Sequence, residues 1–328
     1  MVRAKTRALE GPDERVARCI AQRFPSDHPQ TTAIRRHLES AVRTLLRAGR
    51  ADPQFLTALC STDDQRFWSR LSEALVAQRL GDKVFGEPAK RGAGPDFLLL
   101  HEGRRLWIEV VCPEPTGVPR EWLDPQPLVG GSMPHRELLL RWTAAIHAKA
   151  ERLFVGPEHD GKGYLDSGLV AAHDAYVIAV NACRLRSGPF SSLMGISQFP
   201  FAAEAVFPVG PYQIKIDRES LEVVERGHQY QPLIPNANGA SVPTAMFLDP
   251  AYRAVSAIWA LDLNGGSACG NSEPAFVIHN PMATNPVPLG YLPADAEYVA
   301  TREGDDYVLS KIEVTSARPV EPSLHHEA

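Results

Sequence analysis

Several features that would identify a function or a location at once are missing from this chain of 328 residues. No apolar run approaches the ~20 residues that a membrane-spanning helix needs, and the first residues contain no hydrophobic signal core. The five cysteines are scattered, odd in number and free of Cys-x-x-Cys pairs. They therefore predict neither a disulfide framework nor a zinc ribbon, and we expect a cytoplasmic protein with no membrane partner.

Familiar catalytic and nucleotide-binding motifs are also absent. The sequence contains no Gly-x-Ser-x-Gly nucleophile elbow, no His-Glu-x-x-His metalloprotease motif and no Gly-x-Gly-x-x-Gly fingerprint. These absences give no support to an α/β-hydrolase, a zinc protease of that type or a dinucleotide-binding enzyme.

The chain has no overall excess of positive charge, because its net charge is −5, but the positive charges are unevenly distributed. Residues 1–60 carry eleven Lys and Arg against six Asp and Glu, and the patterns over 13–24, 31–48 and 52–60 predict helices. This basic helical extension could grip the phosphate backbone of DNA or RNA, or its arginines could simply be solvated.

The most informative segment is 94–111, which reads as a β-hairpin. A turn centred on Glu102 and Gly103 places Asp96 directly opposite Glu109. Like charges in that relation repel, so the arrangement favours a cation between them. With a three-residue loop the register would instead slip by one residue and turn Glu109 toward solvent.

Glu109 shares a strand face with the apolar residues Trp107 and Val111. A carboxylate among apolar neighbours either takes up a proton or finds a positive partner, and hard oxygen donors suit Mg²⁺ or Mn²⁺. We therefore expect Asp96 and Glu109 to hold a divalent metal ion.

At these residues the chain resembles the PD-(D/E)XK superfamily, the restriction-endonuclease-like nucleases. In that family an Asp opens one strand, the next strand carries Glu-x-Lys, and a preceding helix often carries another Glu. Pro95-Asp96 matches the first element and Glu109 the second, whereas Val111 occupies the lysine position. The resemblance covers about residues 63–183, and its motif is short.

A helix predicted over 63–80 supplies a candidate for the family's helical glutamate. Glu73 lies on a mostly apolar part of this helix and resembles that residue, which would hold a second ion or orient a water. The alternative is a Glu paired with Arg70 or Arg66 on its own helix.

The missing lysine has a candidate replacement on a second helix, predicted over 135–154. Lys149 falls on the apolar stripe of this helix, which is unusual for a lysine. In the nuclease family the active-site lysine is sometimes supplied by this following helix, and Lys149 resembles such a migrated residue. An ordinary lysine with its stem on the core and its ammonium in water is the alternative.

Downstream of this helix the pattern becomes rich in strands, beginning with a buried parallel strand over 175–181. The other predicted strands are 205–209, 212–216, 256–263, 276–279 and 307–314. From about Thr315 the tail is polar and is predicted to be disordered. We therefore expect a basic helical extension over 1–60, an α/β domain over 61–314 and a disordered tail over 315–328.

The predicted fold is an α/β protein with a mixed central sheet flanked by helices, which implies a restriction-endonuclease-like core after the helical extension. The resemblance implies metal-dependent hydrolysis of DNA or RNA, with Asp96, Glu109, Lys149 and Glu73 in the active site. It also implies that Asp96, Glu109 and the main-chain carbonyl of Val110 hold Mg²⁺ or Mn²⁺. A catalytically degenerate relative that binds nucleic acid or a protein is the alternative, and Val111 is its main support. A third reading is an unrelated α/β domain with a coincidental acidic hairpin.

Overall fold

A computed structural model describes residues 11–87, 94–125, 132–154, 162–188, 191, 193–304 and 306–314. The predicted tail over 315–328 lies outside these ranges. The described helices are α1 (Pro12–Arg23), α2 (Pro29–Arg47), α3 (Phe55–Leu59), α4 (Asp64–Leu80), α5 (Arg120–Leu123), α6 (His135–Phe154) and α7 (Phe201–Val206). The described strands are β1 (Phe97–His101), β2 (Arg104–Val111), β3 (Ala175–Asn181), β4 (Val209–Ile216), β5 (Val223–Tyr230), β6 (Leu233–Pro235), β7 (Ser241–Pro243), β8 (Ala257–Leu261), β9 (Ala275–His279), β10 (Ala296–Glu303) and β11 (Asp306–Glu313).

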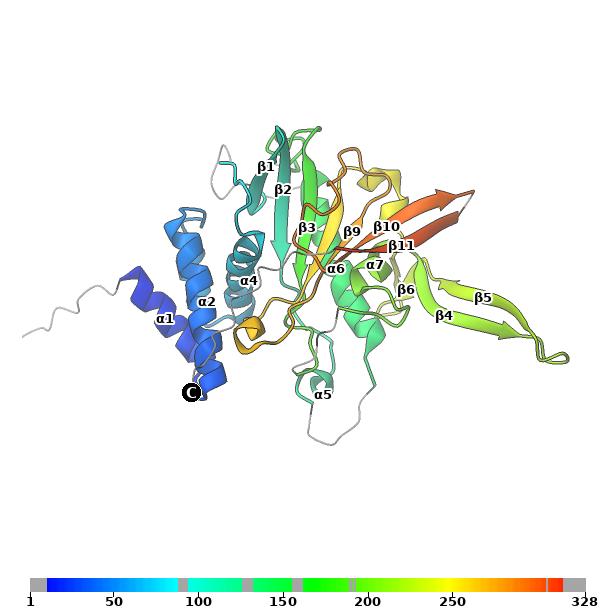
Figure 1. The fold of residues 1–328 in the computed structure, drawn as a ribbon, viewed down its shortest axis with the longest axis horizontal. Coiled ribbons are helices and arrows are strands. Elements are labelled where there is room, and N and C mark those ends of the chain that lie inside the picture. Colours follow the sequence, from blue (N-terminus) through cyan, green and yellow to red (C-terminus); the bar gives the residue numbers. More distant parts are fainter. Residues whose placement is uncertain are drawn as a thin grey trace, which may run out of the picture.

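Seven of these strands form one mixed sheet in the order β1-β2-β3-β8-β9-β10-β11 (Figure 1). The pairs β2–β3, β3–β8 and β9–β10 are parallel. The pairs β1–β2 and β10–β11 at the two ends, and β8–β9 within the sheet, are antiparallel. The prediction of a mixed α/β fold is therefore confirmed, as is the buried parallel strand over 175–181.

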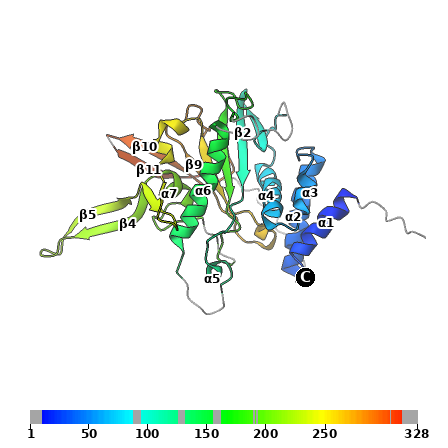
Figure 2. The ribbon, with the colours of Figure 1, turned by 180° about the vertical axis from the view of Figure 1, so that it is seen from behind.

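Helices cover both faces of the sheet. On one face, Ile108 and Val110 of β2 join a core with residues of α1, α2, α3 and α4. On the other face, Trp107 joins a core with α6 and α7, and Figure 2 shows α6 lying across the sheet there. The helical extension thus shares a core with α4 and the sheet.

Local chemistry explains the two helices that were predicted to carry site residues. Asp63 caps α4, since its side chain accepts a hydrogen bond from the Arg66 N–H, and Gly81 ends the helix with a φ of 58°. The second helix, α6, has the bounds predicted from the apolar stripe. Both predictions are confirmed.

The strand predicted over 205–209 is wrong. Residues 205 and 206 belong to the short helix α7, which follows Pro200 and is buried along its whole length. A helix of six residues that is buried along its whole length is too short for its periodicity to separate it from a buried strand. β5 and β10 were not predicted either, and β5 is largely exposed.

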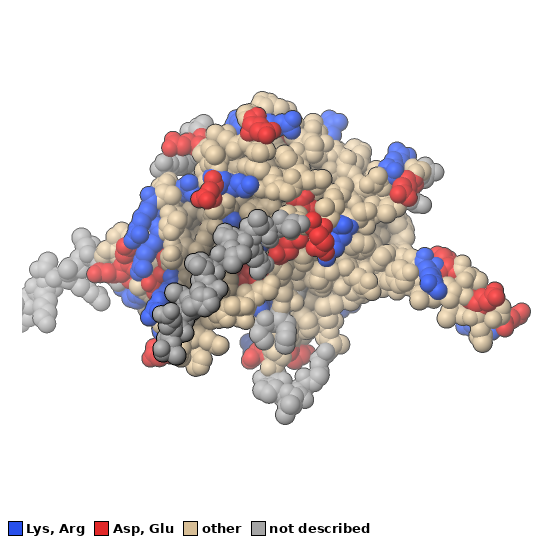
Figure 3. Space-filling view, in the orientation of Figure 1, with Lys and Arg blue, Asp and Glu red and all other residues tan. Residues whose placement is uncertain are grey.

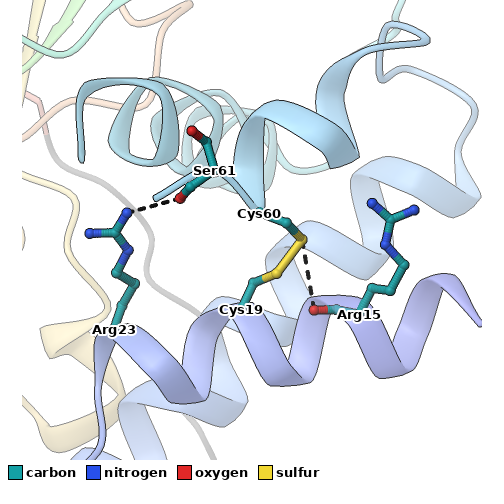
Figure 4. The surroundings of a disulfide bond; sticks show 5 residues. All are labelled: Arg15, Cys19, Arg23, Cys60 and Ser61. Carbon is teal, nitrogen blue, oxygen red and sulfur yellow. Dashed lines mark hydrogen bonds between the residues drawn. A yellow bond between two sulfur atoms is a disulfide. The ribbon is translucent and has the colours of Figure 1, made fainter. Parts of the chain in front are cut away.

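A disulfide joins Cys19 of α1 to Cys60, the residue after α3 (Figure 4). The scattered cysteines gave no indication of this pairing, because the partners are 41 residues apart and are brought together by helix packing. Nearby, the Arg23 side chain donates a hydrogen bond to the Ser61 carbonyl. The disulfide corrects the expectation that the scattered cysteines form no disulfide framework, whereas Cys112, Cys183 and Cys269 are free.

One two-stranded ribbon stands out from the body of the protein. β4 and β5 pair with each other in a separate sheet and extend away from the main sheet as an arm (Figure 1). The side chains of Tyr212, Ile214 and Ile216 on this arm are all exposed. Within the described part of the chain, no helix has the length and apolar character to span a membrane.

Candidate active site

The β1–β2 hairpin has the register that the sequence predicted. Its two-residue turn is Glu102 and Gly103, both with positive φ (50° and 76°), as a type I′ turn requires. The strand pairing ends with Phe97 opposite Ile108, and Asp96 directly precedes β1, within reach of the Glu109 charge. The Val110 N–H donates a hydrogen bond of 2.7 Å to Asp96 Oδ2 and fixes that carboxylate.

Glu109 lies in the interior, with a side chain only 2 % exposed. Lys149 of α6 reaches it, and the Nζ atom lies 2.5 Å from Glu109 Oε1. Arg152, one turn further along α6, is 3.2 Å from the same oxygen. The other oxygen, Oε2, is buried and accepts no hydrogen bond from the described residues. Glu109 thus keeps one oxygen for a further ligand.

The electrostatics of Asp96 differ from those of a surface carboxylate. Burial raises its pKa to about 7, and the nearby charge of Glu109 acts in the same direction. The Lys149 charge and the Val110 hydrogen bond oppose this shift only in part. Without a cation beside it, the ionised form of Asp96 is therefore disfavoured near neutral pH.

Glu73 also belongs to this cluster, but it already has a partner. Arg70 lies one turn earlier on α4 and donates to both Glu73 oxygens at 3.0 Å, as the alternative prediction stated. Burial raises the Glu73 pKa well above its usual range, and the charge of Asp96 adds to the effect. The Arg70 guanidinium also forms an ion pair with Asp52, at 2.7 Å between Nη1 and Oδ2. A role for Glu73 as a metal ligand therefore requires the pair with Arg70 to open.

These groups surround a cavity of about 480 Å³. Acidic and basic residues dominate its chemistry, and the charged lining residues are Arg50, Asp52, Arg70, Glu73, Glu87, Asp96, Glu109 and Arg152. Tyr164 adds a phenol to the wall. The cavity brings together three predicted site residues, Glu73, Asp96 and Glu109, while Lys149 reaches Glu109 from α6.

Sequence reasoning missed several of the cavity's polar residues, among them the four below. Arg50 and Asp52 come from the loop between α2 and α3, and only the packing of the helical extension brings them to the cavity. Tyr164 lies in irregular chain after α6 and carries no pattern. Arg152 was detectable, because it lies three residues after Lys149 on the same helix.

The donor set fits a hard divalent cation in part. Oxygen ligands suit Mg²⁺ or Mn²⁺, and the unpartnered Glu109 Oε2 beside Asp96 supplies such a donor. No cluster of three or more His, Cys, Asp or Glu suited to a metal occurs among the described residues. Asp96, Glu109 and the Val110 carbonyl would therefore leave the remaining positions to water or substrate, as Mg²⁺ commonly does.

Several arginines in the described part of the helical extension form ion pairs with acids. Arg43 and Arg47 both contact Asp13, and Arg35 contacts Asp27. Figure 3 shows basic and acidic side chains interspersed along this flank of the molecule. At these three positions the positive charge is already paired and is less available to a long phosphate backbone.

Comparison with known proteins gives no relative. No family model, curated protein or solved structure matches this chain.

Proposed function

We propose that this protein is a divalent-metal-dependent nuclease of the PD-(D/E)XK type, which hydrolyses phosphodiester bonds in DNA or RNA. The proposed core is restriction-endonuclease-like, with the β1–β2 hairpin, α4 and α6 around the site. The observation that carries the proposal is the contact between Lys149 and Glu109 beside Asp96. It supplies a lysine where the Glu-x-Lys motif has Val111.

Each group has a task that follows from its charge. Asp96, Glu109 and the Val110 carbonyl would hold Mg²⁺ or Mn²⁺, and the bound ion would acidify a water and polarise the phosphate. Lys149 would stabilise negative charge on the attacking or transferred group, since a cation in a buried site acts strongly there. Glu73, held by Arg70, would orient the water or contribute to a second ion.

A catalytically degenerate protein that binds nucleic acid or a protein is the second candidate. Ion pairs inside the site favour it, because Arg70 takes both oxygens of Glu73 while Lys149 and Arg152 share one oxygen of Glu109. Such pairs would also stabilise a cluster of acids that had lost its metal. The two candidates differ in whether the protein cleaves a substrate.

Cleavage of labelled DNA and RNA in Mn²⁺ tests the proposal. Asp96→Asn keeps an oxygen for the Val110 N–H but removes the charge that holds the ion, so activity should fall about 1,000-fold. Asp82→Asn is the matched control, because Asp82 is exposed and does not line the cavity. Retained activity in Asp96→Asn, or no cleavage by the wild type, would refute the nuclease function.

A further inference from the structure

We propose that the cavity receives the free end of a single nucleic-acid strand, and that Arg50 binds a phosphate near that end. This proposal rests on the nuclease function for its chemistry, but the evidence for the strand end comes from other features. These are the size of the cavity, the segments that wall it and the pairing of its cations.

The size of the cavity restricts the substrate. Its volume of about 480 Å³ lies within the range for small ligands, roughly 300–1,000 Å³. A double helix, whose major groove alone is about 12 Å wide, cannot enter such a space. Enzymes that modify a base inside a pocket likewise take single-stranded or extruded nucleotides. Because Glu109 is 2 % exposed, the substrate must come into the cavity to reach it.

The walls favour an end over the middle of a strand. The lining comes from the chain after α2, from α4, from the segment Phe85–Glu87, from the β1–β2 hairpin and from the end of α6 with Tyr164. A continuous strand needs both an entrance and an exit past these segments. A strand end needs only the entrance.

Arg50 differs from the other cations that line the cavity. Arg70 is held by Asp52 and Glu73, and Arg152 by Glu109, whereas no described acid forms an ion pair with Arg50. Its guanidinium carbon lies 3.6 Å from the centre of the Phe85 ring. A guanidinium stacked on an aromatic ring keeps its in-plane N–H groups, which match the oxygens of a phosphate.

The rest of the surface is consistent with short rather than extended contact. Binding along a duplex depends on many unpaired cations, and each phosphate neutralised adds to the salt dependence. In the extension, Arg35, Arg43 and Arg47 are already paired with acids. A single strand end bound at Arg50 requires few further cations.

The test measures binding, so that it does not depend on cleavage. A twelve-nucleotide oligothymidine and the matching oligouridine, each with a fluorophore on an internal base, are titrated with the full chain in Ca²⁺. Fluorescence anisotropy gives the Kd, and unlabelled linear strands, closed circles of the same sequence and blunt duplexes compete. We expect at least one linear strand to bind, and to compete about tenfold or more better than its circle and the duplex.

Substitution of Arg50 tests the residue itself. Arg50→Ala should weaken binding of the linear strand about tenfold, the size of one lost bond to a charged group. Arg36→Ala should change it less than twofold, since Arg36 is an exposed arginine of the same extension that does not line the cavity. Thermal unfolding of both variants at the wild-type temperature would show that the fold is intact.

Several results would overturn the proposal. These are equal competition by circles, stronger binding of the duplex, no binding of either linear strand, or an unchanged Kd in Arg50→Ala. Failure of the nuclease function looks different. End-selective binding without cleavage in Mn²⁺ would support the strand-end site and refute the nuclease function. Equal cleavage of circles and linear strands would support the nuclease function and refute the strand-end site.

Discussion

Two cavities of this molecule differ in chemistry. The one beside the β1–β2 hairpin, of about 480 Å³, is lined by carboxylates and guanidinium groups. The one at the base of the β4–β5 arm, of about 770 Å³, is lined by apolar and aromatic residues such as Phe207, Tyr230 and Leu309. No Asp, Glu, Lys or Arg lines it among the described residues.

The difference shows where chemistry can occur. Gathering carboxylates in a buried place is unfavourable unless cations or hydrogen bonds compensate, and the raised pKa values of Asp96 and Glu73 report that cost. Folding alone gives no reason to collect them there. The apolar cavity carries no such cost, because its lining resembles that of an ordinary core. We therefore place the proposed reaction in the charged cavity and expect substitutions in the two regions to behave differently.

The largest difference is expected between two lysines. Lys149→Met removes the ammonium beside Glu109 and should reduce Mn²⁺-dependent cleavage about 100- to 1,000-fold. Lys215→Met removes a lysine from the arm, where it contacts Glu225 at the surface, and should leave the rate within twofold. Single-turnover cleavage of a labelled strand measures both.

Loss of structure would have to be separated from loss of chemistry in Lys149→Met. Removing one partner of a buried ion pair can cost about 3–5 kcal/mol of stability. The double variant Glu109→Gln, Lys149→Met removes both charges and serves as the folded reference. Full activity in a folded Lys149→Met variant would show that this lysine has no catalytic role.

Sequence alone predicted the hairpin and the two helices that carry the site. A turn at Glu102 and Gly103 determines the register, and register determines which residues face each other across the strands. The apolar stripe of α6 likewise identified Lys149, and Glu109 is its partner. These inferences depend on local rules that a short segment contains in full.

The parts that were missed depend on distant packing. Arg50 reaches the cavity because α2 packs on α4, and Cys19 reaches Cys60 because α1 packs on α3. Neither approach leaves a periodic signal in the sequence. The end of α7 was predicted as part of a strand because a short, wholly buried segment shows no clear helical or strand periodicity.

A moderate effect on stability is expected from Asp96→Asn. The folded-state pKa of Asp96 is about 7, above the ordinary value of 3.8, so the folded state binds the proton more tightly than the unfolded state. This carboxyl therefore lowers the stability of the wild type progressively as the pH rises from about 4 to 7, and the loss stays constant above pH 7. Asn carries no charge, so the Asp96→Asn variant does not lose stability in this way.

Thermal unfolding in EDTA measures this effect. The Tm of Asp96→Asn relative to wild type should be higher at pH 8 than at pH 5 by about 2 °C or more. Asp82→Asn, at an exposed position, should show no such dependence on pH. A Tm difference that is the same at both pH values would show that Asp96 is not under electrostatic strain.

The smallest effect is expected at the arm. Ile214→Lys places a charge on an exposed side chain of β4 that does not line the charged cavity. Its rate of cleavage should remain within twofold of wild type, and surface changes of this kind usually alter stability by about 0.5 kcal/mol or less. A large loss of activity in this variant would show that the β4–β5 arm contributes to cleavage as the charged cavity does.

Calorimetric titration of Mn²⁺ tests the proposed metal site at Asp96 and Glu109, and it needs no knowledge of the substrate. If the two carboxylates hold a metal ion, the wild type should bind Mn²⁺ with measurable heat at pH 7.5. The variant Asp96→Asn, Glu109→Gln should not bind, while Asp82→Asn should bind as the wild type does. Equal binding in the wild type and the double variant, or no binding in either, would show that Asp96 and Glu109 do not form a metal site.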